Sequence, residues 1–114
     1  MRNLWIIIVL VCPIVIACTS KKKQIERWKA EIIQTENDFS NMAADKGIAE
    51  AFLFYADDSA VLERNDVLIK GKQSIADLFE KNSSNSMKVT LSWKPDFVDV
   101  SRSGDLGYTY GKYQ

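Results

Sequence analysis

Histidine is absent from this chain of 114 residues, and cysteine occurs only twice. The absence of histidine removes the commonest general base and a frequent metal ligand. Both cysteines, Cys12 and Cys18, lie near the N-terminus, so the body of the chain offers no thiol for a disulfide, a zinc site or a nucleophile. Any chemistry must come from carboxylates, hydroxyls, lysines or tyrosines, and we expect neither a metal nor a cofactor.

An excess of charge of one sign is also lacking, because 15 basic side chains balance 15 acidic ones. Domains that bind nucleic acid concentrate positive charge on one face or element. The overall balance therefore gives no electrostatic argument for a nucleic-acid partner, and we expect none.

A long apolar run is missing as well. The run from Leu4 to Ala17 follows Arg2 and contains Pro13. It is shorter than the ~20 residues of a membrane-spanning helix and has the length of a signal-peptide core. It ends at Cys18, so the boundary between residues 17 and 18 is the most informative point of the N-terminal segment.

The stretch Val15-Ile16-Ala17-Cys18 resembles the lipobox of bacterial lipoproteins, with a branched residue three positions before the cysteine and a small one just before it. This resemblance implies that residues 1–17 are a signal peptide and that Cys18 is lipidated and becomes the N-terminus. The protein would then be bound to a membrane by its lipid anchor. Two alternatives stay open, namely a single-pass anchor with Cys18 as an ordinary thiol, and an ordinary cleaved secretory signal.

The residues after the cysteine bear on location. Thr19 is not the aspartate that resembles an inner-membrane retention signal, and Lys21-Lys22-Lys23 is unlike an acidic surface-export signal. The resemblance therefore implies the bacterial cell envelope, at the outer membrane and facing the periplasm. We expect residues 18–24 to be the lipidated cysteine and a polar tether.

Apolar periodicity divides residues 25–114 into alternating helices and strands. The expected elements are a long helix from residue 25 to Gly47, a short helix up to Asp57, a hairpin of strands 60–62 and 67–69, a helix after Gly71, and strands over 87–94, 97–100 and from 106 onward. The long helix has an inner stripe of Ile25, Trp28, Ile32, Phe39 and Met42. The last strand still alternates at Gln114, which suggests that more chain follows.

This order of elements resembles the cone-shaped α+β fold shared by nuclear transport factor two, ketosteroid isomerase and the SnoaL-like polyketide cyclases. The stretches that carry the resemblance are residues 54–61, Ile69-Lys70-Gly71 and residues 103–111. It is closest to an uncharacterised subfamily of small secreted and lipid-anchored domains. The resemblance implies one domain, residues 25–114, with N-terminal helices packed on a curved antiparallel sheet that lacks its last strands.

The resemblance also suggests a catalytic carboxylate. Ketosteroid isomerase has its base just after an Ala-Asp-Asp stretch, and this position falls on Glu63. The isomerase tyrosine that stabilises the oxyanion falls near Phe39, which has no hydroxyl, and its second donor would lie beyond Gln114. Glu63 is thus a candidate base, and the alternative is a solvated side chain in a charged hairpin with Arg64 and Asp66.

Aromatic residues on helices and strands are candidates to line a ligand pocket. They are Phe39, Phe52, Tyr55, Trp93, Tyr108 and Tyr110. The alternative is that these side chains form ordinary core. A buried tyrosine hydroxyl needs a hydrogen-bond partner, and a ligand is one such partner.

Three functions are compatible with these features. The leading hypothesis is a lipid-anchored domain that binds a small apolar or amphipathic ligand in its cone. The second is an enzyme of the isomerase, cyclase or dehydratase type that uses Glu63 as its base. The third is an interaction module that forms a homodimer or docks through the open face of the sheet.

Overall fold

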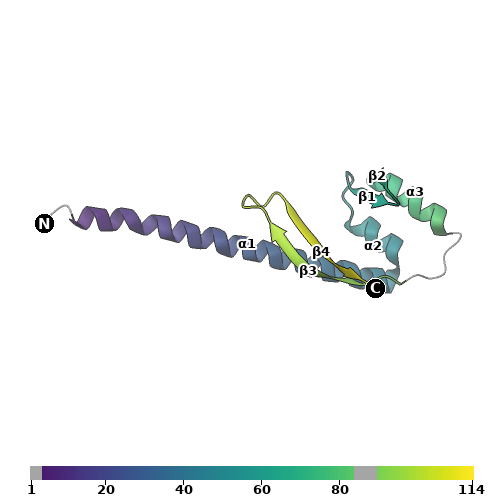
Figure 1. The fold of residues 1–114 in the computed structure, drawn as a ribbon, viewed down its shortest axis with the longest axis horizontal. Helices are drawn as coiled ribbons and strands as arrows, with labels where there is room; N and C mark the ends of the chain where they lie inside the picture. Colours follow the sequence, from purple (N-terminus) through teal and green to yellow (C-terminus); the bar gives the residue numbers. More distant parts are fainter. Residues whose placement is uncertain (1–3, 84–89) are drawn as a thin grey trace.

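The computed structural model describes residues 4–83 and 90–114, with side chains described for residues 20–82 and from residue 90 onward. The elements are α1 (Leu4–Lys46), α2 (Ile48–Tyr55), β1 (Val61–Arg64), β2 (Val67–Lys70), α3 (Lys72–Ser83), β3 (Trp93–Val100) and β4 (Gly107–Tyr113). The molecule is elongated, with extents of 83 × 24 × 22 Å. The reason is that α1 extends far beyond all other elements (Figure 1).

Helix α1 has 43 residues and ends where Gly47 adopts a φ of 100°. Glycine adopts this conformation without the steric cost that a Cβ imposes, so the predicted end of the helix is confirmed. Residues 20–24, which the sequence predicted to be part of a polar tether, belong to α1 instead. This polar stretch contains neither proline nor glycine and continues directly into the amphipathic part of the helix.

The helix α2, the β1–β2 hairpin and α3 lie together at the C-terminal end of α1 (Figure 1). Strands β1 and β2 pair in antiparallel register from Val61↔Lys70 to Arg64↔Val67. Asn65 and Asp66 connect them, and both have positive φ, as a two-residue type I′ turn requires. The predicted hairpin is therefore confirmed. The predicted helix after Gly71 is confirmed as α3.

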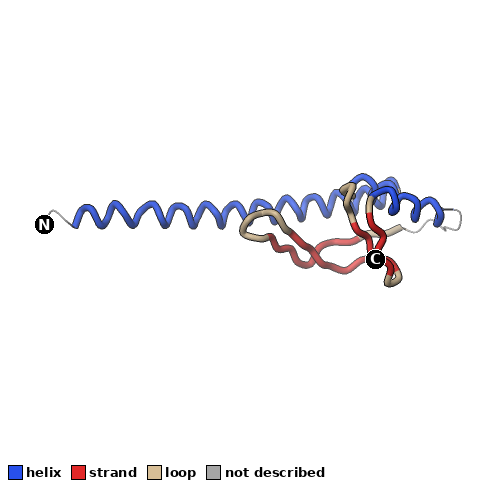
Figure 2. Tube along the Cα trace, turned by 90° about the horizontal axis from the view of Figure 1, so that it is seen from above, coloured by secondary structure: helices blue, strands red, loops and turns tan. Residues whose placement is uncertain are grey.

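The hairpin of β3 and β4 lies along the C-terminal half of α1, as the ribbon and the Cα trace both show (Figures 1 and 2). Its antiparallel register changes between Pro95 and Phe97, which pair with Gly111 and Tyr110. Asp96 is the extra residue of a β-bulge. Because side chains alternate between the faces of a strand, one extra residue moves all later side chains to the opposite face.

The α+β class is confirmed, but no curved cone sheet is present among the described residues. Strands β1–β2 and β3–β4 form two separate two-stranded sheets. The strand predicted over 87–94 begins only at Trp93, and Thr90 to Ser92 are not in a strand. Its first residues, 87–89, lie outside the described residues.

The core is centred on the ring of Phe39. Its centroid lies 4.9 Å from that of Phe52, 4.8 Å from that of Tyr55 and 4.7 Å from that of Trp93. The buried apolar residues around this cluster are small or aliphatic, namely Ala43, Ala51 and Ile75. The aromatic cluster thus joins α1 to α2 and to the start of β3.

Candidate functional site

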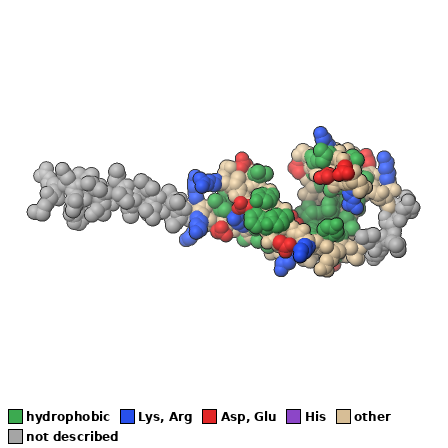
Figure 3. Space-filling view, viewed as in Figure 1, with side chains coloured by type: hydrophobic (Ala, Val, Ile, Leu, Met, Phe, Trp, Pro, Cys, Tyr) green, Lys and Arg blue, Asp and Glu red, His purple; other side chains and the backbone are tan. Residues whose placement is uncertain are grey.

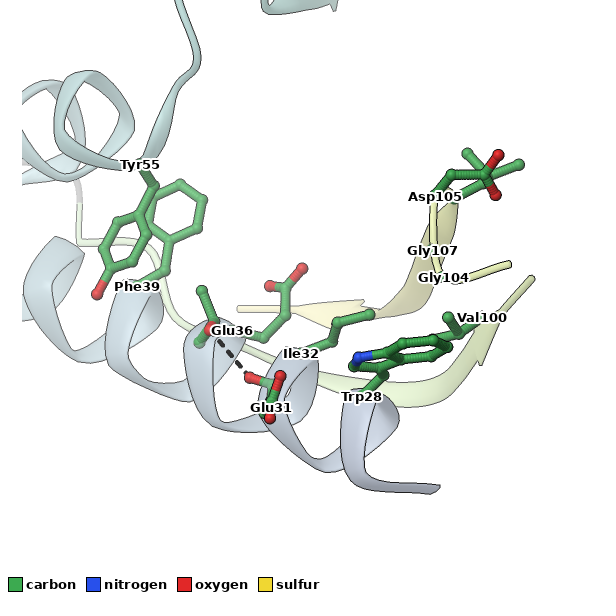
Figure 4. Close-up of a pocket in the computed structure, with 12 residues that line it drawn as sticks. Trp28, Glu31, Ile32, Glu36, Phe39, Tyr55, Val100, Gly104, Asp105 and Gly107 are labelled. Carbon is green, nitrogen blue, oxygen red and sulfur yellow. Dashed lines mark hydrogen bonds between the residues drawn. The ribbon is translucent and has the colours of Figure 1, made fainter. Parts of the chain in front are cut away.

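A groove with a volume of about 550 Å³ lies between α1 and the β3–β4 hairpin. Volumes of this size are typical of small-molecule sites. Phe39 and Tyr55 stand at one end of the groove and Trp28 at the other, with Ile32 and Glu36 between them (Figure 4). The groove therefore has apolar and aromatic walls and a carboxylate near its middle.

Glu36 is fixed in this groove by two hydrogen bonds. The indole N–H of Trp93 donates to Oε2 at 2.7 Å, and the hydroxyl of Thr109 donates to Oε1 at 2.9 Å. Glu36 is half-buried, and its two donors come from different strands of the hairpin. Since both donors are neutral, they orient the carboxylate without cancelling a negative charge.

The loop between β3 and β4 closes the end of the groove at Trp28. Gly104, with a φ of 76°, lies so close to the indole ring that a Cβ at this position would be 2.5 Å from the nearest ring atom. Asp105 accepts hydrogen bonds from the hydroxyls of Ser101 and Ser103. These bonds hold the pKa of Asp105 below its ordinary value, with Ser101 as the larger cause, so the rim is negative at neutral pH.

A salt bridge fixes the hairpin on the helix beside the groove. The ammonium of Lys29 on α1 lies 3.0 Å from a carboxylate oxygen of Asp99 on β3. The hydrogen bond between them raises the pKa of Lys29 and lowers that of Asp99. The contact contributes to the alignment of the two elements that form the walls.

The structure brings four of the six predicted pocket residues together. Phe39 and Tyr55 line the groove and also a second cavity of about 160 Å³, which Phe52 lines as well. Trp93 contacts Phe39 and orients Glu36. These residues are both core and wall, so the two interpretations of the aromatics are not exclusive.

Tyr108 and Tyr110 lie elsewhere. They point away from α1, with exposed fractions of 54% and 61%. The ring of Tyr110 stacks on Phe97 at a centroid distance of 5.0 Å, and that of Tyr108 is tilted against Phe97 at 5.8 Å. The inner face of β4 carries Gly107 and Thr109 instead, which contact Ile32 and Glu36 on α1. Large side chains at these positions would prevent the helix from coming this close.

Glu63 lies on β1, exposed to solvent and opposite Leu68. It is not among the residues that line either cavity described above. This position fits the solvated hairpin that the sequence offered as the alternative. A catalytic role of Glu63 stays a prediction.

Sequence reasoning missed Glu36, although a signal was present. The apolar stripe of α1 passes from Ile32 to Phe39, and helical spacing places Glu36 between them on the same face. A carboxylate on an apolar stripe is costly unless it has partners. The role of Gly104 and Asp105 depends on how the loop folds over Trp28, and the sequence pattern does not predict this loop conformation.

No family model matches the sequence, and no curated protein or solved structure matches it either. The resemblance to cone-fold domains therefore stays a prediction. In the described part of the chain, no helix has an apolar stretch long enough to cross a membrane. Within the same residues, no cluster of acidic or cysteine side chains is placed to hold a metal ion.

Proposed function

We propose that this protein is a cell-envelope lipoprotein that binds a small amphipathic ligand in the groove between α1 and the β3–β4 hairpin. The observation that carries the proposal is the composition of the groove. Aromatic walls stand on both sides of a carboxylate that two hydrogen bonds hold in place. Sites for small molecules typically combine apolar walls with a few fixed polar groups.

The membrane part of the proposal rests on Cys18 and the residues after it. Lys21, Lys22 and Lys23 are exposed on α1, where they add weak attraction to anionic headgroups. Several acyl chains on one cysteine hold a protein on a membrane, since each buried CH₂ contributes about 0.8 kcal/mol. Cys18→Ser should move the protein to the soluble fraction after cell lysis, and continued tight membrane association of this variant would refute the lipoprotein assignment.

The groove is tested with phenylpropanol, a neutral amphipathic probe, added to the full chain in phosphatidylcholine nanodiscs. The readout is the indole N–H resonance of Trp28 in a two-dimensional NMR spectrum, assigned by its loss in Trp28→Phe. We expect a saturable shift, because Trp28 forms one wall of the groove. Empty nanodiscs give the amount of probe that dissolves in lipid.

A matched pair of variants localises the binding. Thr35 lines the groove and is exposed, so Thr35→Phe should fill the space and abolish the shift. Its neighbour Gln34 is also exposed on α1 but does not line the groove. Gln34→Phe should therefore leave the shift unchanged, and an equal loss in both variants would place the probe elsewhere.

A second candidate function is self-association through the outer face of the β3–β4 hairpin. Phe97, Tyr108 and Tyr110 form an aromatic cluster that is exposed on this face, and apolar side chains gather over the hairpin (Figure 3). Exposed aromatic patches are typical of interaction sites. Sedimentation of the wild type and of Tyr110→Ser distinguishes a homodimer, which the variant should weaken, from a monomer.

A further inference from the structure

We infer that the ligand of the groove is an amphipathic cation, with an ammonium group on an aryl or alkyl body. The inference rests on the proposed function, since it names the chemistry of the molecule that the groove takes. Three observations carry it: the charges that line the groove, the partners of these charges, and the aromatic faces beside them.

Among the described residues, the charges that line the groove all have one sign. Glu31, Glu36 and Asp105 line it, and no described lysine or arginine does. This bias is local, because the whole chain has as many basic as acidic side chains. A cleft with charges of one sign and apolar walls raises the local concentration of the opposite charge.

The protein itself leaves most of this charge uncompensated. Glu36 and Asp105 accept hydrogen bonds only from neutral groups and form no ion pair within the described residues. Glu31 pairs with Arg27 at 3.3 Å, but both side chains are more than half exposed, so solvent screens this pair. A ligand cation would supply the missing counter-charge.

Aromatic rings flank the carboxylates at both ends. Phe39 stacks on Tyr55 at a centroid distance of 4.8 Å, and Trp28 forms the opposite end of the groove (Figure 4). Cations are attracted to aromatic faces, most strongly to that of tryptophan. An ammonium near Glu36 would thus lie between aromatic walls that also accept its apolar body.

The test compares three probes with the same apolar body and different head charges: phenylpropylammonium, phenylpropanol and phenylpropionate. Each is titrated into the full chain in phosphatidylcholine nanodiscs, with the Trp28 indole resonance as the readout. We expect the ammonium to bind about tenfold more tightly than the alcohol, as an ion pair with an added cation–π contact predicts. The carboxylate probe should bind most weakly.

Two outcomes distinguish a failure of the inference from a failure of the proposed function. Equal affinities, or tightest binding of the alcohol or the carboxylate, would overturn the cationic ligand but leave the groove as a binding site. The absence of any saturable shift with all three probes would refute both. Added salt should reduce the preference for the ammonium and leave the alcohol unaffected.

Charge variants assign the preference to the groove. Glu36→Gln should bring the affinity for the ammonium close to that for the alcohol. Because Glu36 also holds the hairpin, Glu31→Gln provides a second variant on the exposed rim, with an expected loss of about two- to fivefold. The control is Glu50→Gln, since Glu50 is equally exposed and also forms an i,i+4 pair, with Lys46, but lies outside the groove. An equal loss in this control would overturn the inference.

Discussion

Glu36 connects the stability of the molecule with its proposed function. Its two oxygens join α1 to β3 through Trp93 and to β4 through Thr109, while its position in the groove gives a ligand access to the same carboxylate. A charged group that is half-buried must keep hydrogen-bond partners. The residue therefore fixes the hairpin on the helix and presents a negative charge at the same time.

Truncation of this side chain should destabilise the fold. Glu36→Ala leaves the indole N–H of Trp93 without its acceptor, and an unsatisfied donor that is partly buried costs about 1–2 kcal/mol. Urea unfolding followed by circular dichroism measures the loss. The control is Glu31→Ala, where only an exposed pair is lost and the change should be below about 0.5 kcal/mol. Equal losses would show that the bonds of Glu36 add nothing.

The pair of Lys29 and Asp99 predicts a dependence of stability on pH. The hydrogen bond from Lys29 lowers the pKa of Asp99 in the folded protein. The stabilisation is therefore present above the pKa of the unfolded state and is lost as the pH falls through the lower, folded value. The pKa of Lys29 is raised, mainly by the same bond, so the stabilisation is also lost at alkaline pH, as the pH rises through the raised pKa.

Thermal unfolding measures this dependence. The difference in Tm between the wild type and Asp99→Asn should be largest near neutral pH and should close as the pH falls below about 4. Asp96→Asn is the control, because Asp96 lies on the same strand and has no ion pair within the described residues. A difference that stays constant down to pH 2 would contradict the proposed role of the ion pair.

At the scale of elements, the contact between α1 and the hairpin depends on small residues. Gly104 and Gly107 lie where a Cβ would collide with the side chains of Trp28 and Ile32, respectively. Thr109 on β4 reaches Glu36 on α1 with its hydroxyl. Packing of this density does not accept added volume without displacement. The close approach of the two elements is thus encoded in β4 and in the loop before it, not only in the helix.

Gly104→Ala should destabilise more than Gly47→Ala, although both residues have positive φ. At Gly47 a Cβ meets no atom within 4 Å, so the cost is that of the backbone conformation alone, about 1 kcal/mol. At Gly104 the collision with the Trp28 ring adds about 1–3 kcal/mol. Urea unfolding of both variants gives the difference, and equal values would mean that the loop moves away from the ring freely.

The elements also show how far sequence reasoning reaches. The end of α1 at Gly47, the β1–β2 hairpin and α3 follow from local signals, and the sequence predicted all three, although not the type I′ geometry of the turn. The faces of β3 and β4 do not follow from local signals. Trp93 faces α1 while Phe97 faces solvent, because Asp96 forms a bulge whose position depends on pairing with β4. Trp93 pairs with Tyr113, so alternation along β4 places Tyr108 and Tyr110 on the face opposite to Trp93. The prediction that these three residues share a pocket did not contain this register.

At the scale of the whole molecule, the groove is an open surface feature of an elongated protein rather than the interior of a cone. The β3–β4 hairpin is a single layer, with the groove on one face and the Phe97, Tyr108 and Tyr110 cluster on the other. Helix α1 continues from this layer toward Cys18 without a break. If Cys18 is the anchor, a rigid helix sets the distance between groove and membrane, since each residue adds 1.5 Å.

The continuity of α1 is testable by distance measurements between two spin labels. In a background of Cys12→Ser and Cys18→Ser, labels at Ser20 and Gln34 are 14 residues apart in a continuous helix, or about 21 Å between Cα atoms. Labels at Arg27 and Asn41 have the same spacing but lie wholly within the part that the sequence already predicted to be helical. All four side chains are exposed.

A continuous helix predicts two distance distributions of equal mean and width. A flexible tether at residues 20–24 would broaden only the first, and the groove would then have no fixed distance from the membrane.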